Sequence, residues 1–288
     1  MLDAALRHAP DAPELRIELL QSQDQLFKRL LQLERWAENL AEEEALLEAL
    51  PASQQSPKIV YELSRSQWLT ETNEGQKAIT AAQRALLLAE KTRSNDLLVR
   101  CCHVLGHALQ RQARMSEAGD AFRQMTLYAR RTDNPMLVCR AMNARTEAGF
   151  FSGMPTDELF DVLTSALAIA EEQGQREETS VLYVKLGFLR IATAMGDFER
   201  TEQNLLRARQ LGEEIGDPDR IVVALNHLGL FYTNCGDYRH AQEALRACQV
   251  IERERPVYWR NWETLHYLGA LETQTGRLDI ARTTLARA

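Results

Sequence analysis

The sequence predicts an all-α fold, a superhelical solenoid of about seven helix-turn-helix units, on two observations. The first is composition: alanine, leucine, glutamate, glutamine and arginine dominate, whereas glycine and proline supply only 14 and 8 of the 288 residues. This composition favours helices, and the sequence has no alternating β-branched runs of the kind that strands need. The second is a motif that returns about every 40 residues, which is typical of stacked helical arrays. Because each unit of such an array contacts only its neighbours, we expect residues 1–288 to form one elongated domain.

The repeated motif is clearest in the last third of the chain. A glycine followed by a charged residue and a hydrophobic residue stands at Gly196, Gly236 and Gly276, at intervals of 40 residues. Five residues after each glycine comes a smaller residue, and the same slot continues upstream. The whole series, at steps of 40, 41, 42, 40 and 40, is Ala78, Ala118, Leu159, Thr201, Ala241 and Ala281. The copy around Leu159 is degenerate, and a further copy is expected around Trp36.

Each unit is expected to contain two helices, A and then B, because apolar residues recur at three- and four-residue spacing in both halves. The glycine between them allows a left-handed turn at little cost. Capping residues such as Asp217, followed by Pro218, mark the junctions between units. The expected helices are 14–31 and 35–50 in a degenerate first unit (14–50), then A–B pairs 57–71 and 75–92, 95–112 and 115–131, 135–151 and 155–173, 177–195 and 198–215, 218–235 and 238–254, and 257–275 and 278–288. The later units are therefore expected at 57–92, 95–131, 135–173, 177–215, 218–254 and 257–288.

The clearest units resemble the tetratricopeptide repeat (TPR), whose usual period is 34 residues. The residues that carry the resemblance are Leu228, Gly229, Tyr232, Gly236, Asp237, Tyr238, Ala241, Leu245 and Cys248. The resemblance covers roughly residues 35–288 and implies a right-handed, TPR-like superhelix. The long units, ending in segments such as 168–174 and 211–217, also look like the arrays of bacterial signal-transduction ATPases with numerous domains (STAND proteins). Related large transcriptional regulators and peptide-pheromone receptors carry arrays of the same kind.

The resemblance implies a binding groove, because the A helices of TPR arrays line the concave face. In the A helix 95–112, the stripe of Arg100, His103, His107 and Arg111 would lie on that face. The full set of expected groove residues is Arg100, His103, His107, Gln110, Arg111, Tyr183, Arg190, Asn226, Asn234, His266 and Gln274. Arginine favours carboxylates and phosphates, so the expected partner is a protein or peptide, or a small acidic ligand. The alternative is that these side chains are merely solvated.

Motifs that would indicate chemistry are missing from the sequence. His103 and His107 stand four residues apart, as two metal ligands could, but a zincin needs glutamate where Val104 stands. There is also no GxSxG, GxxxxGK[ST] or GxGxxG motif, so we expect no catalytic residue, metal or cofactor. Cys248 occupies a core slot of the repeat and is expected to be buried. The acidic run Glu42–Glu44 is expected to be a solvated helix face.

The remaining observations bound the partners and the compartment. A formal net charge of −7 disfavours direct nucleic-acid binding. No apolar run of 18 residues could span a membrane, and the N-terminus does not resemble a secretory signal. Five cysteines without CxxC spacing indicate reduced thiols and a cytoplasmic protein. Four aromatic residues near the start of the last A helix could form a binding patch, although packing between units is favoured: Tyr258, Trp259, Trp262 and Tyr267.

Together these features favour a non-catalytic protein- or ligand-binding module, not an enzyme. The resemblance suggests the sensor or interaction part of a larger bacterial signalling or transcription-regulating ATPase. The alternative is a stand-alone adaptor that holds a peptide in its concave groove. The sequence stops at Ala288 within an expected helix and without a polar capping helix, so we expect the natural protein to be longer.

Overall fold

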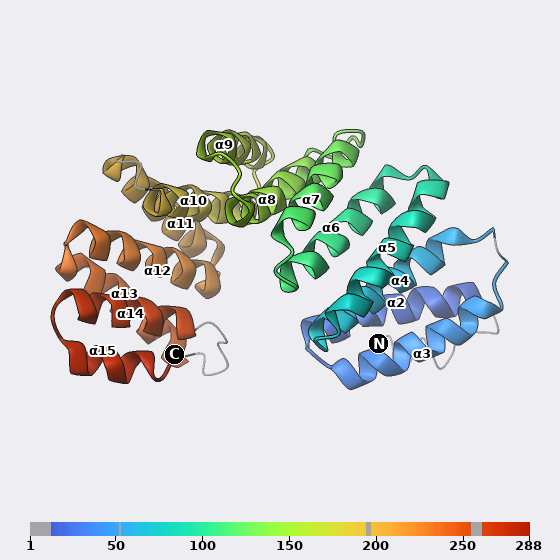
Figure 1. Ribbon diagram of the computed structural model, residues 1–288, viewed down its shortest axis with the longest axis horizontal. Coiled ribbons are helices and arrows are strands. Elements are labelled where there is room, and N and C mark those ends of the chain that lie inside the picture. Colours follow the sequence, from blue (N-terminus) through green and yellow to red (C-terminus); the bar gives the residue numbers. More distant parts are fainter. Residues whose placement is uncertain (1–12, 52, 194–196, 255–260) are drawn as a thin grey trace. The chain divides into compact units, whose positions relative to one another are not determined.

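Helices form all the regular secondary structure in the part of the chain that the structure describes. The computed structural model describes residues 13–51, 53–193, 197–254 and 261–288. Fourteen helices lie in these ranges (Figure 1). They are α2 (Pro13–Arg29), α3 (Leu33–Glu48), α4 (Gln55–Glu71), α5 (Gly75–Thr92), α6 (Asn95–Arg111), α7 (Met115–Ala129), α8 (Pro135–Ser152), α9 (Thr156–Glu172), α10 (Arg176–Ala192), α11 (Phe198–Ile215), α12 (Pro218–Cys235), α13 (Tyr238–Glu254), α14 (Asn261–Gln274) and α15 (Leu278–Leu285).

The expected succession of A and B helices is confirmed, with ends that differ by a few residues. Helix α12 covers residues 218–235 as predicted, whereas α15 ends at Leu285, before the predicted end. The predicted start of the last A helix, at residue 257, lies outside the described residues, and so does Gly196.

Left-handed residues close the A helices, as the glycine motif predicts. Gly236 has a φ of 79° and follows the last residue of α12. In earlier pairs the same slot, five residues before the buried anchor, holds Asn73 (φ 63°) and Ala113 (φ 55°). A left-handed conformation costs a residue with a Cβ about 1–2 kcal/mol, which glycine avoids. The turn therefore persists where glycine is missing, and this explains why the motif is faint upstream.

Side-chain caps begin several A helices, as the junction residues predict. Asp217 accepts hydrogen bonds from the backbone N–H groups of Asp219 and Arg220. Asn134 accepts one from the backbone N–H of Met136. In both helices a proline follows the cap, where no N–H is needed. Each cap satisfies a backbone donor that the helix cannot satisfy itself.

The small positions of the repeat lie at the contacts between helices. All six anchors are buried: Ala78, Ala118, Leu159, Thr201, Ala241 and Ala281. In the pair α12–α13, a Cβ at Gly229 would lie 2.6 Å from the side chain of Leu245, so only glycine allows this approach. Cys248 is completely buried in the neighbouring core, which confirms its expected packing role.

The chain divides into two compact units, residues 1–155 and 156–288. In the described part of the first unit, the A helices α2, α4, α6 and α8 contact one another in order, and α3, α5 and α7 pack against them as B helices. In the second, α10, α12 and α14 form the row of A helices, with α11, α13 and α15 as B helices and α9 packed on α10. The division falls within the predicted unit 135–173, where the motif is most degenerate.

Candidate functional site

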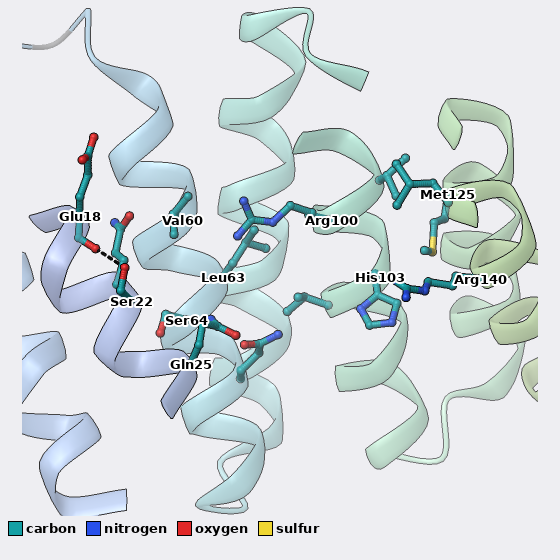
Figure 2. A pocket seen from close by; sticks show the side chains of 15 residues that line it. Glu18, Ser22, Gln25, Val60, Leu63, Ser64, Arg100, His103, Met125 and Arg140 are labelled. Carbon is teal, nitrogen blue, oxygen red and sulfur yellow. Dashed lines mark hydrogen bonds between the residues drawn. The ribbon is translucent and has the colours of Figure 1, made fainter. Parts of the chain in front are cut away.

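A cavity of about 640 Å³ opens along the row of A helices in the first unit (Figure 2). Helices α2, α4, α6 and α8 supply most of its lining, and α7 adds Met125. Its volume lies within the range of about 300–1,000 Å³ that is typical of ligand sites. We call it the A-helix cavity, and its lining residues are Glu18, Gln21, Ser22, Gln25, Val60, Leu63, Ser64, Gln67, Val99, Arg100, His103, Val104, Met125, Leu137 and Arg140.

The apolar part of the lining belongs to the core of the first unit. Leu63, Val99 and Val104 are buried members of the clusters that hold α4, α6 and their B helices together. Met125 is a buried member of the same core. The apolar surface is therefore held in place by packing, and it offers a ligand hydrophobic contact without rearrangement.

The side of the cavity formed by α6 and α8 is basic. Figure 2 shows Arg100 and His103 on α6, and Arg140 on α8 close to His103. Arg100 and His103 point to the same side because residues three apart on a helix share a face. Arg100 is exposed. Two guanidinium groups at one cavity favour the carboxylate or phosphate groups of a ligand.

The side formed by α2 carries the opposite charge. Glu18 is the one carboxylate among the lining residues. Ser22 lies one turn further along and donates its hydroxyl to the backbone carbonyl of Glu18 at 2.8 Å, and Gln25 follows on the same helix (Figure 2). The A-helix cavity is thus negative at α2 and positive at α6 and α8, with an apolar surface between.

A buried polar network lies next to the α2 side. Asp24 and Glu43 are both completely buried. The hydroxyl of Ser64 donates to Asp24, and the indole N–H of Trp36 donates to Ser64 at 2.9 Å. The amide of Gln21 donates to Glu43 at 3.2 Å. Ser64 and Gln21 also line the A-helix cavity, so the network reaches its wall.

The network holds Glu43 in its neutral form. Burial, and then the negative charge of Asp24, raise the pKa of Glu43 to about 9. Burial also raises the pKa of Asp24. The expectation that Glu42–Glu44 is a solvated face is therefore wrong for Glu43, whereas Glu42 forms a surface ion pair with Arg16. Helical periodicity explains the difference, because it turns Glu43 toward α2 and α4 and its neighbour toward solvent.

His103 and His107 lie in contact beside the A-helix cavity. Their Nε2 atoms are 3.1 Å apart, and the ring of His107 also meets Phe122 edge to face. Burial, followed by the positive charges of His107, Lys28 and Arg140, lowers the pKa of His103 to about 4. In the ranges that the structure describes, no group of three or more His, Cys, Asp and Glu side chains is placed to hold a metal ion.

The structure brings together part of the predicted groove set in the first unit. Arg100 and His103 line the A-helix cavity, and His107 contacts His103 from the next turn. Gln110 and Arg111 lie further along α6 and are not among the lining residues.

In the second unit, two predicted groove residues contact helix α9. The hydroxyl of Tyr183 donates to Glu171 of α9 at 2.7 Å. The guanidinium of Arg190 lies 4.9 Å from the ring centroid of Phe160, also on α9. Neither residue lines the A-helix cavity, and their place in a groove of the second unit stays a prediction.

The other predicted residues of the second unit are dispersed. Asn226 is completely buried and accepts a hydrogen bond from the hydroxyl of Thr264 at 3.0 Å, so it packs α12 against α14. Three further predicted residues, on α12 and α14, are exposed: Asn234, His266 and Gln274. None of these four lines the A-helix cavity.

The aromatic residues near the last A helix differ in their exposure to solvent. Trp262 is 48 % exposed, so its expected packing between units is wrong. Tyr267 is half-buried, and its ring meets those of His227 and His266. Tyr258 and Trp259 lie outside the described residues.

The sequence did not indicate that Glu18, Gln25 and Arg140 would belong to the site. Helices α2 and α8 lack a Leu-Gly pair such as Leu105-Gly106 of α6 or Leu228-Gly229 of α12, which sets the register of the clear repeats. Without that pair, the slots that face the cavity could not be assigned on either helix. The packing of four A helices supplies this information.

A second cavity, of about 560 Å³, lies in the second unit and is lined by residues of α11, α12 and α13. Leu225 and Leu228 of α12 contribute apolar surface. The charges at its rim satisfy one another, since Arg209 donates to Glu213 at 2.8 Å. This cavity therefore offers less to a charged ligand than the A-helix cavity does. Of the helices that the structure describes, none has both the length and the hydrophobicity to cross a membrane.

Comparison with known proteins identifies the class of repeat. Residues 222–254, which include most of α12 and all of α13, match the tetratricopeptide repeat family. Among curated proteins, none matches the sequence significantly. The all-helical pairs, their packing and this match together define a TPR-like helical repeat fold.

Several solved structures share this fold. A STAND protein with a tetratricopeptide repeat sensor, from Pyrococcus horikoshii, has a TM-score of 0.76 and 14 % identity, over 99 % of this chain and 43 % of that chain. Aspartyl phosphate phosphatase F from Bacillus subtilis has a TM-score of 0.70 and 13 % identity, over 99 % and 80 %. NprR, in complex with its cognate peptide NprX, has a TM-score of 0.64 and 11 % identity, over 94 % and 77 %. At these identities the likeness establishes the fold alone.

Proposed function

We propose that this chain is a non-catalytic TPR module that binds a peptide, or an extended segment of a partner protein, in the A-helix cavity. The observation that carries the proposal is the cavity itself, which combines an apolar surface with opposite charges at its two sides. A ligand with an acidic group near Arg100 and Arg140 and a cationic group near Glu18 would satisfy both sides. A small acidic ligand would use the basic side only.

The fold likenesses support this kind of partner. NprR was solved with its cognate peptide, and the Pyrococcus protein carries a tetratricopeptide repeat sensor. We propose accordingly that this chain is the sensor or interaction part of a larger bacterial signalling or transcription-regulating ATPase in the cytoplasm. Direct nucleic-acid binding is not proposed, because a net charge of −7 opposes contact with phosphates. The alternative, a stand-alone adaptor, uses the same cavity and differs only in what is attached.

Selection from a display library of short random peptides tests the proposal directly. Peptides recovered on the wild-type chain are titrated by calorimetry against Arg100→Glu and against Arg111→Glu. Both changes reverse one charge on α6, but only Arg100 lines the cavity. We expect Arg100→Glu to weaken binding at least tenfold, since a charged hydrogen bond contributes about 1.5–3 kcal/mol. Arg111→Glu is expected to change the affinity by less than about twofold.

Two results would contradict the proposal. One is that no peptide is enriched over background, and the other is that both variants weaken binding equally. Hydrolysis of ATP by the purified chain would contradict its non-catalytic character. A nucleotide-binding segment encoded beside this chain would favour the ATPase context over the adaptor.

A further inference from the structure

The contact between His103 and His107 limits how many protons the two rings can hold. With Nε2 atoms 3.1 Å apart, one ring must donate and the other must accept. Two donors facing each other would repel, so only one proton fits between these nitrogens. The histidine pair therefore exists in a neutral form, or in a form with one positive charge.

The charges around His103 favour the neutral form while the cavity is empty. Lys28 on α2, Arg140 on α8 and His107 on α6 all oppose protonation, and burial acts in the same direction. Glu71 on α4 interacts with Lys28, and α7 contributes only Met125 to the lining.

The one lining carboxylate lies on the other side of the cavity. Glu18 is on α2, and the buried Asp24 and Glu43 lie in the network next to that side. The α6–α8 side thus has several cationic groups and lacks a lining carboxylate. An arriving anion would add a negative charge beside these cationic groups.

We propose that the basic side of the A-helix cavity is an anion subsite that takes up one proton as it fills, with the histidine pair as the proton acceptor. This inference rests on the proposed function and deepens it, because it names the group of the ligand, a carboxylate or a phosphate, that the cavity holds there. The proton comes from solvent and adds to an imidazole nitrogen, and no other bond forms or breaks. Arg100 and Arg140 hold the anion, and the protonated pair adds a further donor.

The direction of the coupling follows from the charges. An anion offsets Lys28 and Arg140, so the pKa of His103 is higher in the complex than in the empty cavity, where it is about 4. A site that binds a proton together with its ligand binds the ligand more tightly as the pH falls. For one proton the limit is tenfold in affinity for each unit of pH.

The experiment uses the full chain and two probes whose charge is constant between about pH 8 and about pH 5.5. Inorganic sulfate represents a phosphate group, and N-acetyl-Ala-Ala-Ala-Asp represents peptide carboxylates. Calorimetry near the lower pH, in two buffers of different ionisation enthalpy, gives the number of protons taken up. Histidine ring signals in NMR titrations give the pKa of His103 with and without each probe.

We expect an uptake approaching one proton, a raised pKa for His103 and tighter binding at low pH. Uptake with sulfate alone assigns a phosphate-type ligand, uptake with the peptide alone assigns a carboxylate, and uptake with both assigns their shared chemistry. His103→Gln should abolish the uptake, whereas His266→Gln, which changes an exposed histidine on α14, should leave it intact.

Binding with no proton uptake for either of the two probes would overturn the inference, and so would failure of both probes to bind. These results are separable from failure of the proposed function. A peptide selected from the library that binds through Arg100 with no proton uptake preserves the proposed function and refutes only the proton coupling.

Discussion

Replacing Glu43 by glutamine tests the claim that the first unit buries a neutral carboxylic acid. Glu43→Gln keeps the shape of the side chain and removes its ability to ionise. Its oxygen can still accept from Gln21, and its amide can donate toward Asp24. We therefore expect the variant to be more stable than the wild type at neutral pH.

The magnitude follows from the pKa of Glu43. Its value of about 9 in the folded chain lies above the ordinary 4.5, so the folded state holds the proton more tightly. The associated stability is fully present below pH 4.5 and is lost progressively as the pH rises to about 9. At pH 7 the solution is 7 − 4.5 = 2.5 pH units above the ordinary pKa of the carboxyl group. At about 1.4 kcal/mol per unit, the loss in the free energy of unfolding is about 3 kcal/mol. Glutamine does not ionise, so the variant avoids this loss. About 3 kcal/mol is therefore the upper limit of its gain in the free energy of unfolding at pH 7.

The assay is urea unfolding at several pH values, followed by far-ultraviolet circular dichroism and by tryptophan fluorescence. Trp36 is fully buried and donates to Ser64 in the same network, so its emission reports on this part of the fold. The matched control is Glu42→Gln, one residue earlier in α3, which breaks the surface pair with Arg16. It should change the free energy of unfolding by less than about 1 kcal/mol.

The difference between Glu43→Gln and the wild type should grow from near zero below pH 4.5 to its largest value near pH 9. Destabilisation by Glu43→Gln of similar size at every pH would refute the reasoning. It would mean that Glu43 is ionised in the folded chain and that its charge is compensated.

Two further predictions follow from packing and exposure. Gly106→Ala would push a methyl group into the ring of Phe122, and should destabilise by about 1–3 kcal/mol in urea unfolding. Gly119→Ala, where a Cβ meets open space and one contact at 3.9 Å, should instead stabilise by up to about 1 kcal/mol; equal effects of the two would contradict the packing. Of the five cysteines only Cys235 is exposed, so Ellman's reagent should label one thiol in the native chain and five in urea, and Cys235→Ser should remove the native signal. Rapid native labelling of more than one thiol would refute the burial of the others.

Local signals in the sequence sufficed to predict the helices and their arrangement in pairs. Apolar spacing of three and four residues, capping residues such as Asp217 and the glycine after α12 act within one or two helical turns. The anchor series worked for the same reason: Ala118 and Ala241 are completely buried at the contacts that the period predicts. The burial of Cys248 was predicted in the same way, from its position in the repeat.

The candidate site was only partly predictable, because it depends on which side chains of separate helices converge. Arg100 and His103 were found, since α6 has a clear Leu-Gly register. Glu18 and Arg140 were not, because the first A helix and α8 lack that register. The contacts of Tyr183 and Arg190 with α9 were not indicated by the repeat, because they depend on how two helices pack.

The sequence by itself determined an all-helical repeat fold of A and B pairs, because period, caps and turn residues are properties of short segments. Only the tertiary structure decided the chemistry of the first unit. It placed Glu43, from an acidic run that looks solvated in sequence, beside Asp24 in the interior. It also placed the histidine pair beside Arg140 at the A-helix cavity. The physical reason is that burial and neighbouring charge, which set protonation, arise between helices that are distant in the chain.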